Sequence, residues 1–89
     1  MNIYALEPKH DRVKSFYNKA HVIINDDGSK ILQSYETDVI RKNADGTFSR
    51  LWDDWSATTG RHINEFFLQE CGRTCNKAEW QKMEVVTDE

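Results

Sequence analysis

Residues 25–47, NDDGSKILQSYETDVIRKNADGT, decide the fold, because they begin and end with the same turn pattern. The pattern is N-x-D-G-[ST], and it occurs at 25–29 and again at 43–47. Asn and Asp side chains favour a turn by hydrogen bonding to nearby backbone, and Gly takes the left-handed position of a three-residue hairpin loop. Two such loops predict a three-stranded antiparallel β-meander. The predicted strands are 15–25, 30–42 and 48–52.

Three-residue loops also fix which residues lie opposite each other in the meander. Ile23 then faces Ile31, and Val39 faces Leu51. One face of the sheet is predicted to carry Tyr17, Ile23, Ile31, Tyr35, Thr37, Val39 and Leu51. The other face is predicted to carry Phe16, Val22, Ile24, Leu32, Ile40, Phe48 and Trp52. Both faces hold apolar side chains, so the helical half covers one of them, and the pattern does not choose which.

Residues 52–72, WDDWSATTGRHINEFFLQECG, predict the main α-helix. Their apolar residues recur at intervals of three and four, which places them on one side of a helix. This apolar stripe consists of Ile63, Phe66, Phe67 and Cys71. Ser56 suits the N-cap and Gly72 suits a left-handed C-terminal stop. The helix is therefore predicted from about Ala57 to Cys71.

The length of 89 residues predicts a single α+β domain. Asn76 and Glu79 have the spacing of a capping box, which opens a short C-terminal helix at 77–83. Pro8 breaks any early helix or central strand, and the polar residues after it predict a poorly specified segment with at most a short turn of helix at 9–14. The domain then consists of a loosely structured arm at 1–14, the β-meander at 15–52 and a helical part at 56–84.

Composition predicts a soluble protein of the cytoplasm. The net charge is -3, which disfavours nucleic-acid binding because phosphate contacts need Lys and Arg. No apolar run approaches the roughly 18 residues of a membrane span, and the N-terminus lacks the apolar core of a signal peptide. In the cytoplasm, Cys71 and Cys75 are expected to be free thiols.

Hydroxyl groups and aromatic rings gather where the main helix begins, and they form the candidate site. Its residues are Tyr35, Trp52, Trp55, Ser56, Thr58, Thr59, Arg61 and His62. A helix N-terminus offers unpaired N–H groups and a partial positive charge, which suit a phosphate or a carboxylate. The indoles and the phenol would supply a stacking wall. Helix capping and core packing account for the same residues without a ligand, and the sequence leaves both interpretations open.

Neither catalysis nor metal binding has a complete set of residues in this sequence. His62 is a candidate general acid or base, but no nucleophile motif accompanies it, so we expect no enzyme activity. Arg61 and Glu65, four residues apart, are predicted as a pair on the exposed side of the helix. Cys71 and Cys75 have the spacing of a zinc-ligand pair, but no second pair completes four ligands. No metal and no cofactor are predicted.

Three phrases carry a resemblance to a known family: FYNKA at 16–20, LQSYETDV at 32–39 and WSATTGRHINEF at 55–66. The combined pattern FY-x-KA, L-x-SY-x-T-x-V, WSATT-x-RHI-x-EF resembles a family of small uncharacterised proteins. They are encoded by phages, prophages and mobile elements of Firmicutes and other gut bacteria. The resemblance implies a genomic setting in which small proteins often act by binding, and it carries over no functional residues.

These observations together predict a small non-enzymatic binding or regulatory protein whose partner is a protein, for example as an inhibitor or an anti-defence factor. The first alternative is a binder of a nucleotide or another phosphate-bearing small molecule at the N-terminus of the main helix. The second is a DNA-binding regulator that uses Arg41, Lys42 and Arg50 on the sheet. An apolar sheet face left uncovered by the small core would also favour a homo-oligomer.

Overall fold

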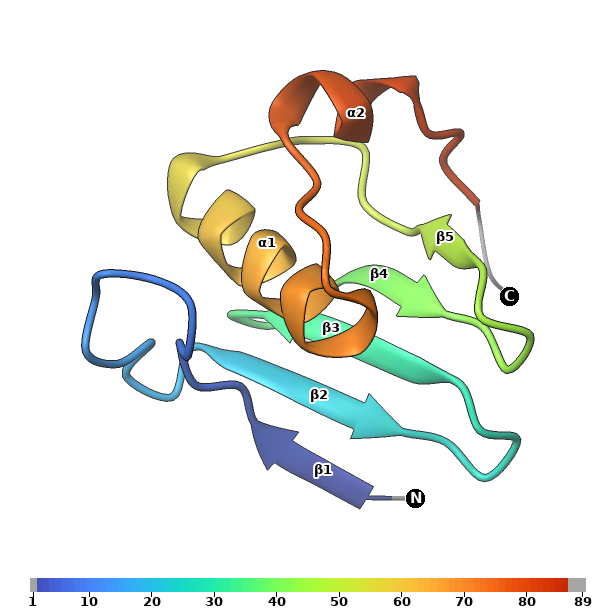
Figure 1. Cartoon of the computed structure of the whole chain (residues 1–89). Helices are drawn as coiled ribbons and strands as arrows, with labels where there is room; N and C mark the ends of the chain where they lie inside the picture. Colours follow the sequence, from blue (N-terminus) through green and yellow to red (C-terminus); the bar gives the residue numbers. More distant parts are fainter. Residues whose placement is uncertain (1, 87–89) are drawn as a thin grey trace.

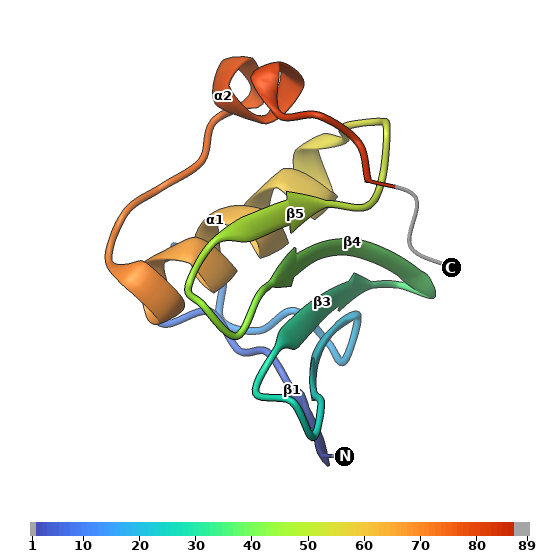
Figure 2. The same cartoon turned by 90° about the vertical axis from the view of Figure 1, so that its right-hand side faces the viewer.

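The computed structural model describes residues 2–86. Its elements are β1 (Asn2–Ala5), β2 (Ala20–Ile24), β3 (Lys30–Ser34), β4 (Thr37–Lys42), β5 (Phe48–Arg50), α1 (Ala57–Cys71) and α2 (Lys77–Lys82). The strands form one antiparallel sheet in the order β1-β2-β3-β4-β5. Helix α1 lies along one face of this sheet, and α2 lies beyond it on the side of β5 (Figure 1, Figure 2). The predicted α+β class, with a main helix and a short C-terminal helix, is confirmed.

The sheet has five strands, so the prediction of three is wrong for two reasons. First, the predicted strand at 30–42 turns back on itself between β3 and β4, where Ser34 lies opposite Thr37. A two-residue hairpin loop needs positive φ at its first residue, and Tyr35 takes it with φ 58° although Tyr normally favours strands. Second, β1 forms in the segment predicted to be an arm, and it pairs along β2.

The two N-x-D-G-[ST] turns close three-residue hairpin loops as predicted. Gly28 and Gly46 have φ of 91° and 92°, so each takes the left-handed position. Ile23 lies opposite Ile31 in the β2–β3 pair. At the second loop, Val39 lies opposite Leu51 as predicted, because the Leu51 amide donates to the Val39 carbonyl at 3.0 Å. The register predicted from the turn chemistry is confirmed at both loops.

A β-bulge in β4 changes which side chains reach the core. Leu32 pairs with Ile40, but Gln33 pairs with Asp38, so Val39 is an extra residue without a direct partner on β3. An extra residue interrupts the strict alternation of side chains, and both Val39 and Ile40 are fully buried. The prediction that Val39 shares a face with Ile23 is therefore wrong. Helix α1 covers the other predicted face, whose Val22, Leu32 and Ile40 are in the core.

The ends of both helices follow the predicted caps. The Ser56 hydroxyl accepts a hydrogen bond from the Thr59 amide, and Gly72 ends α1 with φ 78°. Asn76 and Glu79 form the reciprocal capping box that opens α2. Where α1 ends, however, Cys71 is exposed, so its prediction as part of the apolar stripe is wrong, and Cys75 is buried. The chain turns back after Gly72, and the Cys75 amide donates to the Asn64 side chain at 2.8 Å, which brings Cys75 into the core.

Arg50, at the end of β5, attaches α2 to the sheet. Its guanidinium donates to the carbonyls of Trp80 and Met83, both at 3.1 Å, and to that of Trp52 at 2.8 Å. It also lies 4.9 Å above the centre of the Trp80 ring. Carbonyls at the end of a helix carry partial negative charge, so they suit a buried cation. Arg50 is therefore a structural residue and does not face solvent as the DNA-binding alternative required.

Candidate functional site

A pocket of about 500 Å³ opens between residues 13–19, the β3–β4 turn and the first turns of α1. We call it the tyrosine pocket. Its lining residues are Val13, Ser15, Phe16, Tyr17, Lys19, Tyr35, Thr58, Arg61 and His62. The volume falls in the range of sites that hold a small molecule or a protruding side chain. Segments far apart in the sequence build it, so the fold is needed to assemble it.

Two exposed tyrosines flank the pocket in an unusual backbone conformation. Tyr17 is 75% exposed with φ 51°, and Tyr35 is 50% exposed with φ 58°. Asn18, next to Tyr17, has φ 61°. Left-handed backbone costs a residue other than Gly roughly 1–2 kcal/mol, and Asn tolerates it better than Tyr. Large apolar rings thus project into solvent at two positions where a smaller residue would fit the backbone better.

His62 forms the buried wall of the pocket and is only 1% exposed. Its Nδ1 lies 2.8 Å from the Ser34 hydroxyl, which in turn lies 2.9 Å from the Thr59 hydroxyl. The Phe16 ring meets the imidazole edge to face, with centroids 4.5 Å apart. Desolvation by burial lowers the pKa of His62 from 6.5 to about 4, so the ring is neutral at pH 7. A neutral imidazole offers one donor and one acceptor, and Ser34 occupies one of the two.

The rim of the pocket is basic. Lys19 and Arg61 both line it, next to the hydroxyl-bearing Thr58. Arg61 also donates to the Asp11 carboxylate at 2.7 Å and remains about half exposed. A partner group at this rim therefore meets an apolar, aromatic interior bordered by cationic side chains, which favours an acidic or aromatic group.

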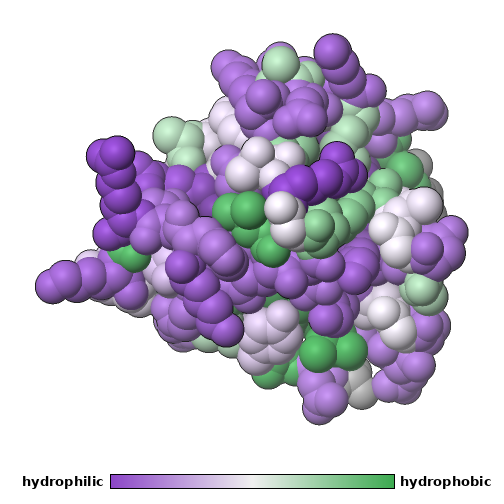
Figure 3. Space-filling model, in the orientation of Figure 1, coloured by the Kyte–Doolittle hydropathy of each residue, from purple (hydrophilic) through white to green (hydrophobic). Residues whose placement is uncertain are grey.

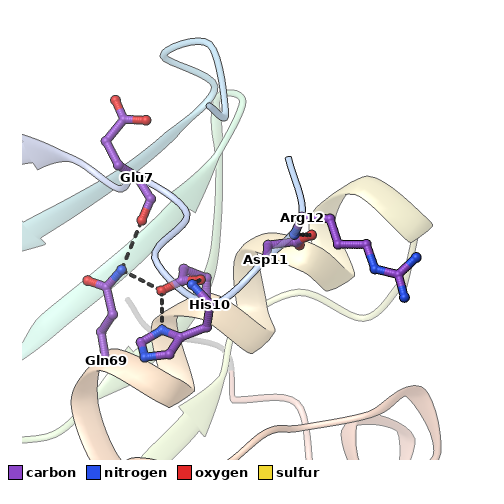
Figure 4. Close-up of polar contacts among 6 residues, drawn as sticks. Glu7, His10, Asp11, Arg12 and Gln69 are labelled. Atoms are coloured by element: carbon purple, nitrogen blue, oxygen red, sulfur yellow. Dashed lines mark hydrogen bonds and ion pairs between the residues drawn. The ribbon is translucent and has the colours of Figure 1, made fainter. Parts of the chain in front are cut away.

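Residues 7–15, which lead into the pocket, are attached to α1 by a buried carboxylate. The Glu65 side chain accepts hydrogen bonds from the His10 amide at 2.9 Å, from His10 Nδ1 at 2.8 Å and from Gln69 Nε2 at 2.6 Å. Gln69 Nε2 also donates to the Glu7 carbonyl at 2.9 Å. Figure 4 shows His10 of the segment and Gln69 of α1 pointing toward this contact from opposite sides. We call these contacts the Glu65 anchor.

The ionisation of Glu65 is coupled to this anchor. Desolvation by burial, the largest effect, raises its pKa, but hydrogen bonds from His10, Gln69 and Lys9 together outweigh it and leave the pKa lowered. Glu65 therefore stays ionised with its side chain only 1% exposed. The prediction of Glu65 on the exposed side of the helix is wrong, because the 7–15 segment covers that side. Its predicted neighbour Arg61 pairs with Asp11 of the same segment instead.

The structure separates the eight residues of the predicted site into two groups. Tyr35, Thr58, Arg61 and His62 line the tyrosine pocket, and Thr59 supports it from behind through Ser34. Trp52, Trp55 and Ser56 do not line it. Ser56 caps α1, and the two tryptophans pack partly buried against the core.

Trp55 has a specific structural role. It packs so closely on Gly60 that a Cβ atom at that position would lie 2.5 Å from Trp55 Cζ2. Its ring centroid is 6.2 Å from that of Trp80. The absence of a side chain at Gly60 is thus what lets the indole lie on the helix. Core packing therefore accounts for Trp55, and of the three aromatic residues expected to form a stacking wall only Tyr35 lines the pocket.

Sequence reasoning missed Phe16, Tyr17 and Lys19 as pocket residues. They lie in the loop that leads from the 7–15 segment into β2, and the Lys19 carbonyl accepts from the Tyr35 amide at 2.6 Å. That contact brings the loop beside the β3–β4 turn. The available signal was the FYNKA phrase at 16–20, which has aromatic and basic residues around Asn18, a residue that favours turns and takes φ 61° here.

A second hollow, of about 610 Å³, lies between the C-terminal end of α1, the β4–β5 loop and α2. In Figure 3, hydrophobic surface is visible near the middle of the view, interrupted by hydrophilic side chains. Phe48, Phe67 and Arg73 line the hollow; the two Phe rings stack with centroids 4.3 Å apart, and the Arg73 guanidinium lies 5.7 Å from the Phe67 ring centre. The two Phe rings pack at the edge of the core, and neither residue has a positive φ. Core packing therefore accounts for these rings without a ligand, and this hollow is the weaker candidate site.

The described residues offer little for metal binding, membrane crossing or DNA binding. Within residues 2–86, no cluster of three or more His, Cys, Asp or Glu side chains is arranged to hold a metal ion. No helix in that range is long and apolar enough to cross a membrane. Of the cations invoked for DNA binding, Lys42 pairs with Glu70 at 3.3 Å, Arg50 is buried, and Arg41 donates to Asn43 at 2.8 Å.

The comparisons with known proteins point to a family without an assigned activity. No curated protein and no solved structure matches the chain. A model of the family of unknown function DUF8033 matches residues 4–82, which include the whole tyrosine pocket and the Glu65 anchor. This agrees with the resemblance to an uncharacterised family that the three sequence phrases indicated. Because the match spans most of its length, the chain belongs to the DUF8033 family.

Proposed function

We propose that this protein is a non-enzymatic binding protein and that the tyrosine pocket is where it holds a partner protein. The observation that carries the proposal is the pair of exposed tyrosines, Tyr17 and Tyr35, held in left-handed backbone beside the pocket. Tyrosine is among the residues that contribute most to protein interfaces, because it offers a large rigid ring with a polar end.

The left-handed backbone of Tyr17 and Tyr35 has a cost that folding alone does not explain. A left-handed Tyr is less stable than Asn or Gly at the same position, and an exposed ring recovers little by burial. Selection for folding alone would favour the smaller residue at Tyr17 and Tyr35. A binding role supplies the missing reason, since the backbone fixes the direction of each ring and reduces the entropy lost when a partner binds.

The pocket between the rings fits an anchor side chain from the partner. Its interior is aromatic around Phe16 and His62, and its rim carries Lys19 and Arg61. A fully buried aromatic or aliphatic anchor surrounded by polar contacts is the usual centre of a protein interface. His62 acts here as a wall residue, because burial keeps it neutral and its Nδ1 is engaged with Ser34.

The test compares capture of a partner by three immobilised proteins from a lysate of the organism that encodes the gene. The double variant Tyr17→Asn, Tyr35→Asn keeps a residue that tolerates left-handed backbone, so we expect equal or higher thermal stability and loss of the captured protein. Val85→Asn, at an exposed apolar residue outside the pocket, is the matched control and should capture as the wild type does. Retention of the same protein by the double variant would refute the proposal, as would a wild type that captures nothing.

A phosphate-bearing small molecule is the second candidate, favoured by Lys19, Thr58 and Arg61 at the rim near the N-terminus of α1. Its weakness is the ion pair between Arg61 and Asp11, which already compensates one of the two charges. Calorimetry with nucleotides and inorganic phosphate tests it. Binding should weaken in Lys19→Ala and Arg61→Ala variants that remain folded, and an unchanged affinity in both would dismiss it.

We also propose, on the sequence resemblance alone, that the gene belongs to phages or mobile elements and that the protein works in the host cytoplasm. An inhibitor of a host enzyme or an anti-defence factor fits a small binding protein in that setting. The genes that flank members of the family provide the test. Consistent location among phage or prophage genes supports the proposal, and consistent location among housekeeping genes contradicts it.

A further inference from the structure

The two edges of the sheet differ in how they are covered. Along β5, Arg50 forms a parallel bridge with Val85, and the Val86 amide donates to the Arg50 carbonyl at 2.7 Å. Along β1, no other strand among residues 2–86 pairs with the outward side. In Figure 1, β1 borders the sheet at the bottom of the view with no element beside it. An open edge of this kind presents unpaired N–H and C=O groups to any strand that can pair with them.

The hydrogen-bond pattern identifies the outward groups. The Leu6 amide donates to the Ala20 carbonyl at 2.8 Å, which makes these two residues a hydrogen-bonded pair. Such pairs alternate along antiparallel strands, so Tyr4 and Val22 form the next one. The intervening residues Ile3 and Ala5 therefore direct their N–H and C=O groups away from β2.

The side chains of β1 do not protect this edge. The strand reads Asn-Ile-Tyr-Ala and contains no charge, no proline and no bulge, the features that usually prevent edge pairing. Ile3 is 61% exposed and Tyr4 is 39% exposed. Ile3 lies opposite Ile23, which lies opposite Ile31, so an apolar row crosses the face that α1 leaves open and ends at this edge.

We propose that a second copy of this chain pairs antiparallel along β1, so that one sheet continues through both copies. A two-fold axis perpendicular to the sheet places the same face of both copies on the same side of the combined sheet. Side chains that lie opposite each other across the new pair must therefore point to the same face. The register with Tyr4 opposite Tyr4 of the partner subunit satisfies this condition. It places Ile3 opposite Ala5 of the partner subunit and pairs every outward N–H and C=O of Ile3 and Ala5.

A second copy fits this edge better than an unrelated strand because the edge is self-complementary. The same two residues, Ile3 and Ala5, supply all donors and all acceptors of the new ladder. An uncharged strand also lets two chains of net charge -3 approach without like charges at the contact. The Tyr4 rings would pair across the axis in a non-hydrogen-bonded position, where cross-strand side chains are closest.

Cysteine cross-linking tests the register. In a Cys71→Ser background, which removes the exposed native thiol, Tyr4→Cys places two cysteines with Cα atoms about 4.5 Å apart, within disulfide range. We expect a covalent dimer after mild oxidation. Ile3→Cys is the matched control, because it is diagonal to its equivalent at about 7–8 Å, beyond the usual Cα separation of a disulfide. More cross-linking through Ile3→Cys than through Tyr4→Cys would overturn the proposed pairing.

Sedimentation tests the pairing itself. Ala5→Pro removes one outward N–H but leaves the hydrogen bonds to β2 intact, and proline is tolerated on that side of an edge strand. We expect the wild type to sediment as a dimer at micromolar concentration and folded Ala5→Pro to sediment as a monomer. A monomeric wild type at every concentration would overturn the proposal, and so would a dimer that Ala5→Pro leaves intact. If Ala5→Pro unfolds the domain, the cross-linking result decides.

Discussion

Replacing Glu65 by Gln removes a buried charge from the Glu65 anchor while keeping the size of the side chain. The carboxylate accepts hydrogen bonds from two groups of His10 and from Gln69. Hydrogen bonds to a charged group contribute roughly 1.5–3 kcal/mol each. The Gln side chain keeps one acceptor oxygen, but its NH₂ group replaces the other and would face the N–H donors of His10 and Gln69. We expect Glu65→Gln to lower the free energy of unfolding by about 3 kcal/mol and Tm by roughly 12–24 °C.

The effect should depend on pH in a defined direction. The pKa of Glu65 is lower in the folded protein than in the unfolded chain. Its ionised form therefore stabilises the fold at pH values above the ordinary glutamate pKa of about 4.3, and this contribution is lost as the pH falls through the lowered pKa. The stability difference between wild type and Glu65→Gln should thus be largest near pH 7 and shrink below pH ~4.

Chemical denaturation of both proteins at several pH values measures this difference, and hydrogen exchange shows where it acts. We expect faster exchange in residues 7–15 of the variant. The matched control is Glu70→Gln, a carboxylate of α1 whose side chain is 8% exposed and pairs with Lys30 and Lys42 of the sheet. It should lower stability without releasing residues 7–15. A stability difference for Glu65→Gln that stays constant from pH 7 to pH ~3 would refute the linkage argument.

Three further substitutions test other contacts. Gly60→Ala should destabilise the fold by about 1–3 kcal/mol in thermal denaturation, although Ala favours helix, because the new methyl meets Trp55; an unchanged Tm would contradict this packing. Arg50→Met should cost about 2 kcal/mol and accelerate hydrogen exchange in α2, because three carbonyls lose a donor; unchanged exchange there would show that α2 does not depend on Arg50. His62→Gln should flatten the pH dependence of stability between 6.5 and about 4, where the wild type loses stability because its unfolded chain binds a proton that the folded chain does not; a slope equal to that of the wild type would contradict a buried neutral ring.

The parts of the fold that depend on local chemistry were predictable. The N-x-D-G-[ST] turns fixed the register at two loops, and Ser56 and Gly72 fixed the limits of α1, because each signal acts within a few residues. The β3–β4 turn carries no such signal, since Tyr35 and Glu36 are poor turn residues. Length was the usable clue: residues 30–42 would make a strand of 13 residues, whereas strands usually have about 3–10. The bulge at Val39 depends on packing between strands, so the alternation of apolar and polar residues along the sequence could not predict it.

The candidate site shows the same division between local and distant contacts. Its residues on α1, Arg61 and His62, could be selected from the sequence because a helix N-terminus is recognisable. Tyr17 and the Glu65 anchor could not, because they depend on the 7–15 segment folding back over α1. Places where a residue opposes its local preference are expected where function outweighs stability. Tyr17 and Tyr35 oppose their local preference in this way. Under the proposed function, Asn substitutions there abolish partner binding and leave folding intact, which separates the demands of binding from those of folding within one pocket.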